Sequence, residues 1–235
     1  EHRVADPSEL YRTSGNVLLD RIFGANLREF DKGTDFDVAM DAVADEVRAN
    51  GGVPYIVPGG ASNAVGALGY VGCGEELLQQ LDEQNLKIDH IVTATGSAGT
   101  HGGLVVGLRA SGSDLPILGI GVNAPQDVQE ERVFGLACET AELVGKPGCV
   151  SREDIVADCN YIGPGYGEPT EGMNEAVLML ARQEGLLFDP VYSGKALAGM
   201  IDHIRKGMFG TDEKIVFLHT GGAAGLFAYA DTLVL

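Results

Sequence analysis

The sequence predicts an α/β fold built on a mostly parallel β-sheet. Short apolar runs alternate along the chain with longer stretches whose apolar residues recur at helical spacing, which is the pattern of repeated strand–helix–strand units. Turns rich in glycine separate many of these segments, as at residues 51–52 and 220–222. With 235 residues, of which 45% are hydrophobic, the chain is long enough for one large domain or two small ones.

The first quarter of the chain predicts two helices and two strands. Residues 16–23 and 35–50 have the periodicity of amphipathic helices, and a glycine follows each of them. Residues 27–30 and 53–57 are short and mostly apolar. We expect a strand at the first of these and a buried strand at the second.

The segment 58–63, rich in glycine and small polar residues, is the predicted boundary between residues 1–58 and residues 59–235. Downstream of it, helices and strands alternate without a break. The expected helices are 64–84, 99–110, 126–144, one capped by Thr170 that ends near Gly185, and one that begins near Lys195. The expected strands are 89–93, 115–121 and 215–218.

The charge balance excludes nucleic-acid binding. The chain carries 16 Lys and Arg against 34 Asp and Glu, and its net charge of −18 repels a phosphate backbone. No apolar stretch reaches the roughly 18 to 20 residues that a bilayer-spanning helix needs. We therefore expect no nucleic-acid partner and no membrane partner.

The cysteines and histidines predict no metal site. The four cysteines lie far apart without a C-x-x-C pair, and the five histidines form no H-E-x-x-H or similar cluster. Scattered free thiols favour a reducing compartment. We expect a cytoplasmic protein that holds no metal.

A run of small residues at 95–100 joins the predicted strand 89–93 to the predicted helix 99–110. A strand that turns through small residues into a helix aims several free backbone N–H groups at one point, where an anion such as phosphate binds. The run lacks the lysine of G-x-x-x-x-G-K-[ST] and does not fit G-x-G-x-x-G. A tight turn alone also needs glycine, so both interpretations stay open at this point.

In open parallel sheets the ligand lies beyond the carboxyl ends of the strands, so the loops there belong together. Tyr192 lies between Pro190 and Gly194, a setting from which a side chain projects. A phenol stacks on an aromatic cofactor or transfers a proton. Taken alone, Tyr192 and Tyr166 are more simply loop tyrosines that cover apolar surface.

The remaining candidate residues each have a purely structural interpretation as well as a functional one. Lys195 has the amine that a Schiff base needs, but we expect a lysine in the first turn of a helix, solvated or paired with Asp189. Thr220 ends an apolar strand, where it either bonds to a ring nitrogen or caps a helix. We expect His101 and His219 to be hydrogen-bonded to the backbone rather than to act as acids or bases.

Five motifs taken together resemble one enzyme family, and they occur in order over nearly the whole chain. They are Val57-Pro58-Gly59-Gly60-Ala61-Ser62-Asn63 with the glycine-bearing run that follows, the loop 96–100, Pro164-Gly165-Tyr166-Gly167-Glu168-Pro169, Asp189-Pro190-Val191-Tyr192-Ser193-Gly194-Lys195, and His219-Thr220-Gly221-Gly222-Ala223. The chain is similar to the pyridoxal-phosphate family of D-cysteine desulfhydrase, L-cysteate sulfo-lyase and aminocyclopropane-carboxylate deaminase.

The resemblance implies a tryptophan-synthase-β-like fold (fold type II), in which two parallel-sheet α/β domains enclose the cofactor. Residues 1–58 are then the remainder of the small domain, and residues 59–235 are the large, cofactor-binding domain. The residues implied to hold the cofactor phosphate are Gly96, Ser97, Ala98, Gly99 and Thr100. Thr220 is implied to meet the pyridine nitrogen, Tyr192 to lie against the ring or substrate, and Tyr166 to face the substrate. The family also suggests a homodimer and a small amino-acid substrate.

Two positions favour the carbon–sulfur lyases within this family. The deaminase typically has glutamate at the position of Ser193 and leucine at the position of Thr220, so Ser193 joins the two tyrosines as a candidate catalytic residue. The expected reaction is β-elimination, which turns L-cysteate into pyruvate, sulfite and ammonia, or D-cysteine into pyruvate, sulfide and ammonia. Aminocyclopropane-carboxylate deamination is the alternative within the family.

The chain departs from the family at its start. The family's Schiff-base lysine, and the serine-asparagine segment that holds the substrate carboxylate, belong to an N-terminal stretch without a counterpart in these 235 residues. We expect a piece of a longer chain, inactive without the rest. A non-catalytic ligand-binding module is the alternative from another class. A dinucleotide-dependent oxidoreductase lacks support, because residues 115–121 end on glycine rather than on an acidic residue.

Overall fold

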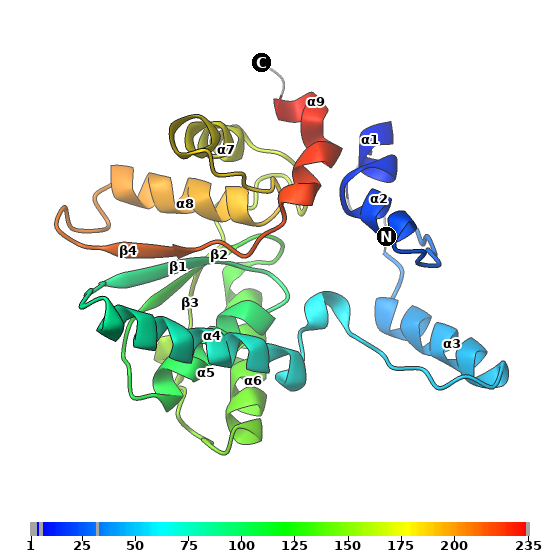
Figure 1. The fold of residues 1–235 in the computed structure, drawn as a ribbon, viewed down its shortest axis with the longest axis horizontal. Helices are drawn as coiled ribbons and strands as arrows, with labels where there is room; N and C mark the ends of the chain where they lie inside the picture. Colours follow the sequence, from blue (N-terminus) through cyan, green and yellow to red (C-terminus); the bar gives the residue numbers. More distant parts are fainter. Residues whose placement is uncertain (1–3, 5–6, 32, 234–235) are drawn as a thin grey trace.

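A parallel β-sheet forms the centre of the computed structural model, which describes residue 4 and residues 7–31 and 33–233 (Figure 1). Its strands are β1 (His90–Thr95), β2 (Ile117–Gly121), β3 (Val156–Asp158) and β4 (Ile215–Leu218). They pair in the order β3-β2-β1-β4, and each pair is parallel. The carboxyl ends of the strands therefore open at one edge of the sheet.

Helices cover both faces of this sheet (Figure 1). One face carries α4 (Ala64–Glu83), α5 (Gly99–Ala110) and α6 (Gln126–Leu143), and the other carries α7 (Glu171–Glu184) and α8 (Ser193–Arg205). Successive strand residues point to opposite faces, so Ile91 packs in the cluster of Leu104 and Val92 packs in the cluster of Ala196. The predicted α/β fold with a parallel sheet is confirmed.

The N-terminal helices lie to one side of the sheet (Figure 1). They are α1 (Glu9–Thr13), α2 (Gly15–Ile22) and α3 (Phe36–Ala49), and the remaining short elements are η1 (Gly59–Ala61), η2 (Arg152–Asp154), η3 (Ala223–Tyr229) and α9 (Ala230–Leu233). Both α1 and α2 contact η3, where the ring of Tyr11 meets that of Tyr229 edge-on at 5.8 Å. The predicted domain boundary after residue 58 coincides with the start of η1 and stays a prediction.

Local sequence signals set the ends of several helices. The side chain of Asn63 accepts a hydrogen bond from the N–H of Gly66 at the start of α4, and that of Thr170 accepts one from Met173 at the start of α7. Gly185 ends α7 in the left-handed conformation, with a φ of 70°. None of the described helices has both the length and the apolar character that a bilayer span requires.

The strands predicted at 27–30 and 53–57 are wrong. Neither segment forms a strand, and the side chains of the second are not buried, since Val53 is 96% and Tyr55 85% exposed. Apolar residues predict a buried strand only where another strand and a covering layer are available. The sheet pairs only β1 to β4 within the part of the chain that the structure describes, so these two segments have no strand partner there.

Glycines bring α4 and α5 into close contact. A Cβ atom at Gly103 would lie 2.4 Å from the carbonyl oxygen of Ala67, and one at Gly107 would lie 2.3 Å from that of Val71. Both contacts join a residue of α4 to the residue 36 positions later in α5, so the two helices run parallel and in register. The N-termini of α4 and α5 therefore lie side by side.

This contact predicts opposite effects for two helical Gly-to-Ala substitutions. Gly107→Ala places a methyl group against the backbone of α4, and overpacking of this kind lowers the free energy of unfolding by about 2 kcal/mol. Gly72→Ala, in α4, meets nothing within 4 Å. It should raise the free energy of unfolding by up to about 1 kcal/mol, because alanine is the better helix former. Urea unfolding of the two variants measures both; equal effects would contradict the close contact.

Candidate functional site

The loop between β1 and α5 presents free backbone N–H groups at the carboxyl edge of the sheet. Ala98 is left-handed, with a φ of 83°, and no side chain caps α5. Within the described part of the chain, the N–H groups of Ser97, Ala98 and Thr100 have no hydrogen-bond partner. Together with the positive end of the helix dipole, they form a site for an anion.

The segment around η1 lies directly against this loop. A Cβ atom at Gly60 would be 2.5 Å from Oγ of Ser97, and one at Gly99 would be 2.8 Å from Oγ of Ser62. The Ser62 hydroxyl donates to Oγ of Ser97 at 2.7 Å and accepts from the N–H of Gly99 at 3.2 Å. Two motifs that are far apart in the sequence thus form one cradle.

Polar side chains next to the loop 96–100 hold it in place. The hydroxyl oxygen of Thr95, the last residue of β1, lies 3.0 Å from Nε2 of Gln129 and 3.3 Å from Nδ1 of His101. Arg132 donates to the carbonyl oxygen of Gly96 at 3.1 Å. Complete burial lowers the pKa of His101 to about 4, so its ring is neutral at pH 7. His101 therefore supports the loop through a side chain, not through the backbone contact that we expected.

The two candidate tyrosines meet each other. The hydroxyls of Tyr166 and Tyr192 are hydrogen-bonded at 2.5 Å, and their rings are T-shaped with centroids 5.6 Å apart. The ring of Tyr192 also lies beside the loop 96–100, the candidate phosphate loop, because a Cβ atom at Gly96 would be 3.4 Å from its Cε1. One aromatic side chain thus links the anion cradle to the second tyrosine.

The carboxylate of Asp189 fixes the backbone around Tyr192. It accepts hydrogen bonds from the N–H groups of Val191, Tyr192 and Ser193, each at 2.8 Å, and from the Ser193 hydroxyl at 2.6 Å. Ser193 is 1% exposed, and its hydroxyl also accepts from the N–H of Asp189. The hydroxyl of Ser193 is thus turned toward Asp189, and a direct contact with substrate stays a prediction.

Lys195 is neither solvated nor paired with Asp189, so that expectation is wrong. Its side chain is fully buried in the first turn of α8, and Nζ donates to the carbonyl oxygens of Ile162 at 2.6 Å and Gly165 at 2.9 Å. Burial lowers the pKa of Lys195 to about 8, although the charge of Glu168 opposes this. The carboxylate of Asp189 is already engaged by the backbone of its own turn.

Thr220 follows the carboxyl end of β4 by two residues. The last residue of that strand, Leu218, pairs with Thr93 of β1, which is two residues before the end of β1. The Thr220 side chain is exposed and caps no helix. The neighbouring His219 donates from Nε2 to the carbonyl oxygen of Leu187 and accepts at Nδ1 from the N–H of Gly221, the backbone contacts that we expected.

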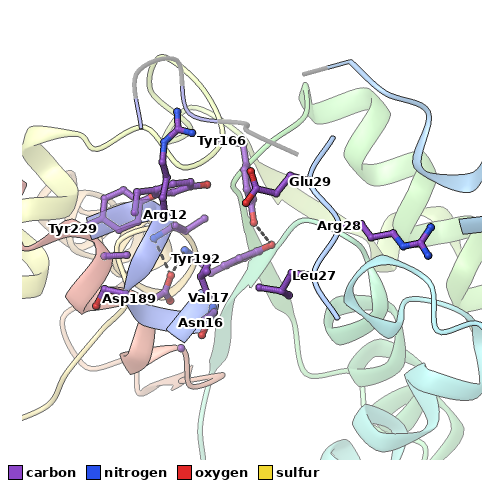
Figure 2. Close-up of a pocket in the computed structure, with 16 residues that line it drawn as sticks. Arg12, Asn16, Val17, Leu27, Arg28, Glu29, Tyr166, Asp189, Tyr192 and Tyr229 are labelled. Carbon is purple, nitrogen blue, oxygen red and sulfur yellow. Dashed lines mark hydrogen bonds between the residues drawn. The ribbon is translucent and has the colours of Figure 1, made fainter. Parts of the chain in front are cut away.

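A cavity of about 420 Å³ opens beside the tyrosine pair. Figure 2 shows Tyr166 and Tyr192 among the lining residues, with Tyr229 and Asp189 to one side of them and Leu27 and Glu29 to the other. Its walls come from α1 and α2, the segment 27–29, both tyrosine loops and η3. The volume suits a small molecule rather than a polymer.

Sequence reasoning missed three contributors to this site. Gln129 lies in the first turn of α6, Tyr229 in a short 3₁₀ helix, and Asp189 had been considered only as a partner for Lys195. The motif that places Asp189 three residues before Tyr192 was the only available signal. No group of three metal-binding side chains occurs among the residues that the structure describes, so nothing there supports a metal centre.

The residues present fit the phosphate that the resemblance implies. Three unpartnered N–H groups converge at a helix N-terminus whose glycines leave no room for side chains. An aromatic ring lies beside this cradle, and the exposed Thr220 follows the end of the adjacent strand β4. The donor set therefore suits a phosphorylated aromatic ring.

Comparisons with known proteins agree with this geometry. The chain is 39% identical over 232 residues to a 1-aminocyclopropane-1-carboxylate deaminase of Methylobacterium nodulans and 41% identical over 229 residues to a D-cysteine desulfhydrase of Salmonella typhi; each match covers 97% of this chain and 69% of the relative. A crystal structure of an ACC deaminase homologue superposes with a TM-score of 0.84 at 36% identity, over 94% of this chain and 66% of that one. The chain thus spans about two thirds of the length of these proteins, and the type II fold is confirmed.

The family model described as pyridoxal-phosphate dependent enzyme matches residues 8–221. That match includes the phosphate loop, both tyrosine loops and Thr220, and it covers most of the chain. The protein therefore belongs to the family of pyridoxal-phosphate-dependent enzymes.

Proposed function

We propose that this chain is the cofactor-binding part of a carbon–sulfur lyase that cleaves a small sulfur-bearing amino acid by β-elimination. The hydrogen-bonded pair of Tyr166 and Tyr192, placed between the phosphate loop and the cavity, is the observation that carries the proposal. The 41% identity to a D-cysteine desulfhydrase supports D-cysteine as the first substrate to test. L-cysteate and aminocyclopropane-carboxylate are the other two substrates of the family resemblance.

Each part of the site has a proposed task. The unpartnered N–H groups of Ser97, Ala98 and Thr100 hold the cofactor phosphate, with the backbone of Gly96 and Gly99 beside it, and the Thr220 hydroxyl meets the pyridine nitrogen. When bound, pyridoxal phosphate withdraws electrons from the α-carbon of the attached amino acid. A threonine hydroxyl leaves the ring nitrogen uncharged more readily than a carboxylate would, which suits elimination of a good leaving group.

In this proposal, the tyrosine pair supplies the proton that the leaving sulfur takes up. The leaving sulfur takes a proton more easily from a hydroxyl whose resulting negative charge is stabilised by a second hydroxyl. Oη of Tyr192 supplies that proton and Oη of Tyr166 stabilises the charge.

The compartment and the assembly are also part of the proposal. The four cysteines are free thiols, which are typical of a reducing cytoplasm. The family resemblance suggests a homodimer. The acidic chain supports the absence of a nucleic-acid partner, because a net charge of −18 repels phosphate backbones.

Gly60→Ala tests the phosphate cradle. Gly60 has a φ of 67°, and a Cβ atom there would press on Ser97. A strain of ~1.4 kcal/mol, at the low end for such a backbone, corresponds to about tenfold weaker binding of pyridoxal phosphate. Gly59→Ala is the matched control, because a Cβ atom there meets nothing within 4 Å. Equilibrium titration of the complete gene product with the cofactor compares the two, and equal affinities would count against the cradle.

Tyr192→Phe tests the proton-transfer role. The ring and its contact with Gly96 remain, so cofactor affinity should hardly change, whereas kcat/KM should fall about 100-fold with loss of the proton donor. Tyr55→Phe is the control, since Tyr55 is 85% exposed and does not line this cavity.

The assay follows pyruvate with sulfide from D-cysteine, pyruvate with sulfite from L-cysteate, and ammonia from aminocyclopropane-carboxylate. It uses the complete gene product loaded with pyridoxal phosphate. The proposal expects turnover of one of the sulfur compounds to exceed that of the cyclopropane. Turnover of the cyclopropane alone would assign the deaminase, and turnover of none of the three would refute the lyase.

A further inference from the structure

The buried ammonium of Lys195 bridges the two segments that carry the tyrosines. Lys195 lies in the same helical turn as Tyr192, and its acceptors Ile162 and Gly165 belong to the loop of Tyr166. Burying an amine without partners costs several kcal/mol, and two carbonyl oxygens offset that cost. The position of the Tyr166 loop relative to the turn of Tyr192 thus depends on the side chain of Lys195.

The Tyr166 loop is a succession of turns with contacts to groups outside it. It contains Gly163 and Gly167, both with positive φ, and Glu168 donates from its N–H to the carbonyl oxygen of Gly165 at 3.2 Å. On its far side, the Tyr229 hydroxyl donates to the carbonyl oxygen of Gly167 at 2.8 Å. The loop is therefore held by groups from outside it, with Lys195 at one end and Tyr229 at the other.

We propose that Lys195 is a positioning residue, which ties the Tyr166 loop to the first turn of α8 and thereby sets the contact between the hydroxyls of Tyr166 and Tyr192. Asp189 fixes the backbone of Tyr192 in the same turn, so Lys195 completes the arrangement from the other tyrosine's side. The amine of Lys195 does not line the cavity. It acts on the reaction through the tyrosines, not on the substrate.

The first test measures the loop and does not depend on the reaction. In the complete protein loaded with pyridoxal phosphate, Lys195→Met removes both donors while keeping an unbranched side chain of similar length. Hydrogen exchange of the peptide covering residues 161–169 should become at least about tenfold faster, because that loop loses a tether. Lys87→Met is the matched control, because the side chain of Lys87 is exposed between α4 and β1, away from this loop. Unchanged exchange in the Lys195→Met variant would overturn the inference.

The second test separates positioning from simple loss of stability. This part rests on the proposed function, so it uses the substrate that the wild-type protein turns over. Lys195→Met should lower kcat by about 100-fold, as expected for a misplaced catalytic group, and change KM much less. Added to Tyr166→Phe, it should cost less than about twofold more, since the hydroxyl that it positions is already gone. Additive losses would overturn the inference.

Two further measurements test the positioning role of Lys195. If Lys195→Met does not fold, Lys195→Gln keeps an uncharged donor group on a shorter side chain and should give intermediate exchange and intermediate kcat. Wild-type values in this variant would count against the tether. Borohydride reduction that attaches the cofactor to Lys195 would also refute a positioning role. If the wild type turns over none of the substrates, the proposed function fails, whereas the exchange experiment still tests Lys195.

Discussion

The close, parallel contact of α4 with α5 is the constraint on which the rest of the site depends. This contact joins Ala67 to Gly103 and Val71 to Gly107, and just before the start of α4 Ser62 contacts Gly99, the first residue of α5. Two helices packed in parallel place two positive dipole ends side by side, which is unfavourable without an anion nearby. The glycines of α5 thus allow the N-terminus of α4 to lie beside the phosphate loop, next to the N-terminus of α5.

The second half of the site depends on two buried charges, Asp189 in the loop before α8 and Lys195 in the first turn of that helix. Asp189 accepts four hydrogen bonds within its own turn, whereas Lys195 gives two to a loop some thirty residues earlier in the chain. Neither charge neutralises the other, so each needs backbone partners. The hydrogen bonds of Asp189 hold the backbone around Tyr192, and those of Lys195 hold the loop of Tyr166. Together they fix the positions of the two tyrosines.

The sequence predicts the helices and the central strands well because their signals are local. The capping side chains of Asn63 and Thr170 and the terminal glycine of α7 lie within a few residues of the ends that they determine. The segment 53–57 has the composition of a strand but no partner strand in the described structure, and the three residues of β3 are too few to show a pattern. Pairing is a property of the sheet, which composition does not reveal.

The same distinction between local signals and contacts across the fold applies to the site. Family likeness assigned the glycine loop and the tyrosines, but their mutual contact became visible only in three dimensions. Lys195 shows the limit most clearly. A lysine in a first helical turn is normally solvated, and only the carbonyl oxygens of Ile162 and Gly165 make its burial tolerable. Its partners lie 33 and 30 residues away, beyond the reach of any local pattern.

The acidity of the chain bears on how the phosphate is held. A net charge of −18 disfavours an anion at long range, yet at physiological ionic strength interactions between exposed charges fade over about 8 Å. Affinity for a phosphate group must then come from groups in direct contact with it. The unpartnered N–H groups of Ser97, Ala98 and Thr100 are such groups, and no lysine is needed beside them. A backbone cradle at two helix ends therefore lets a strongly acidic protein bind an anionic cofactor.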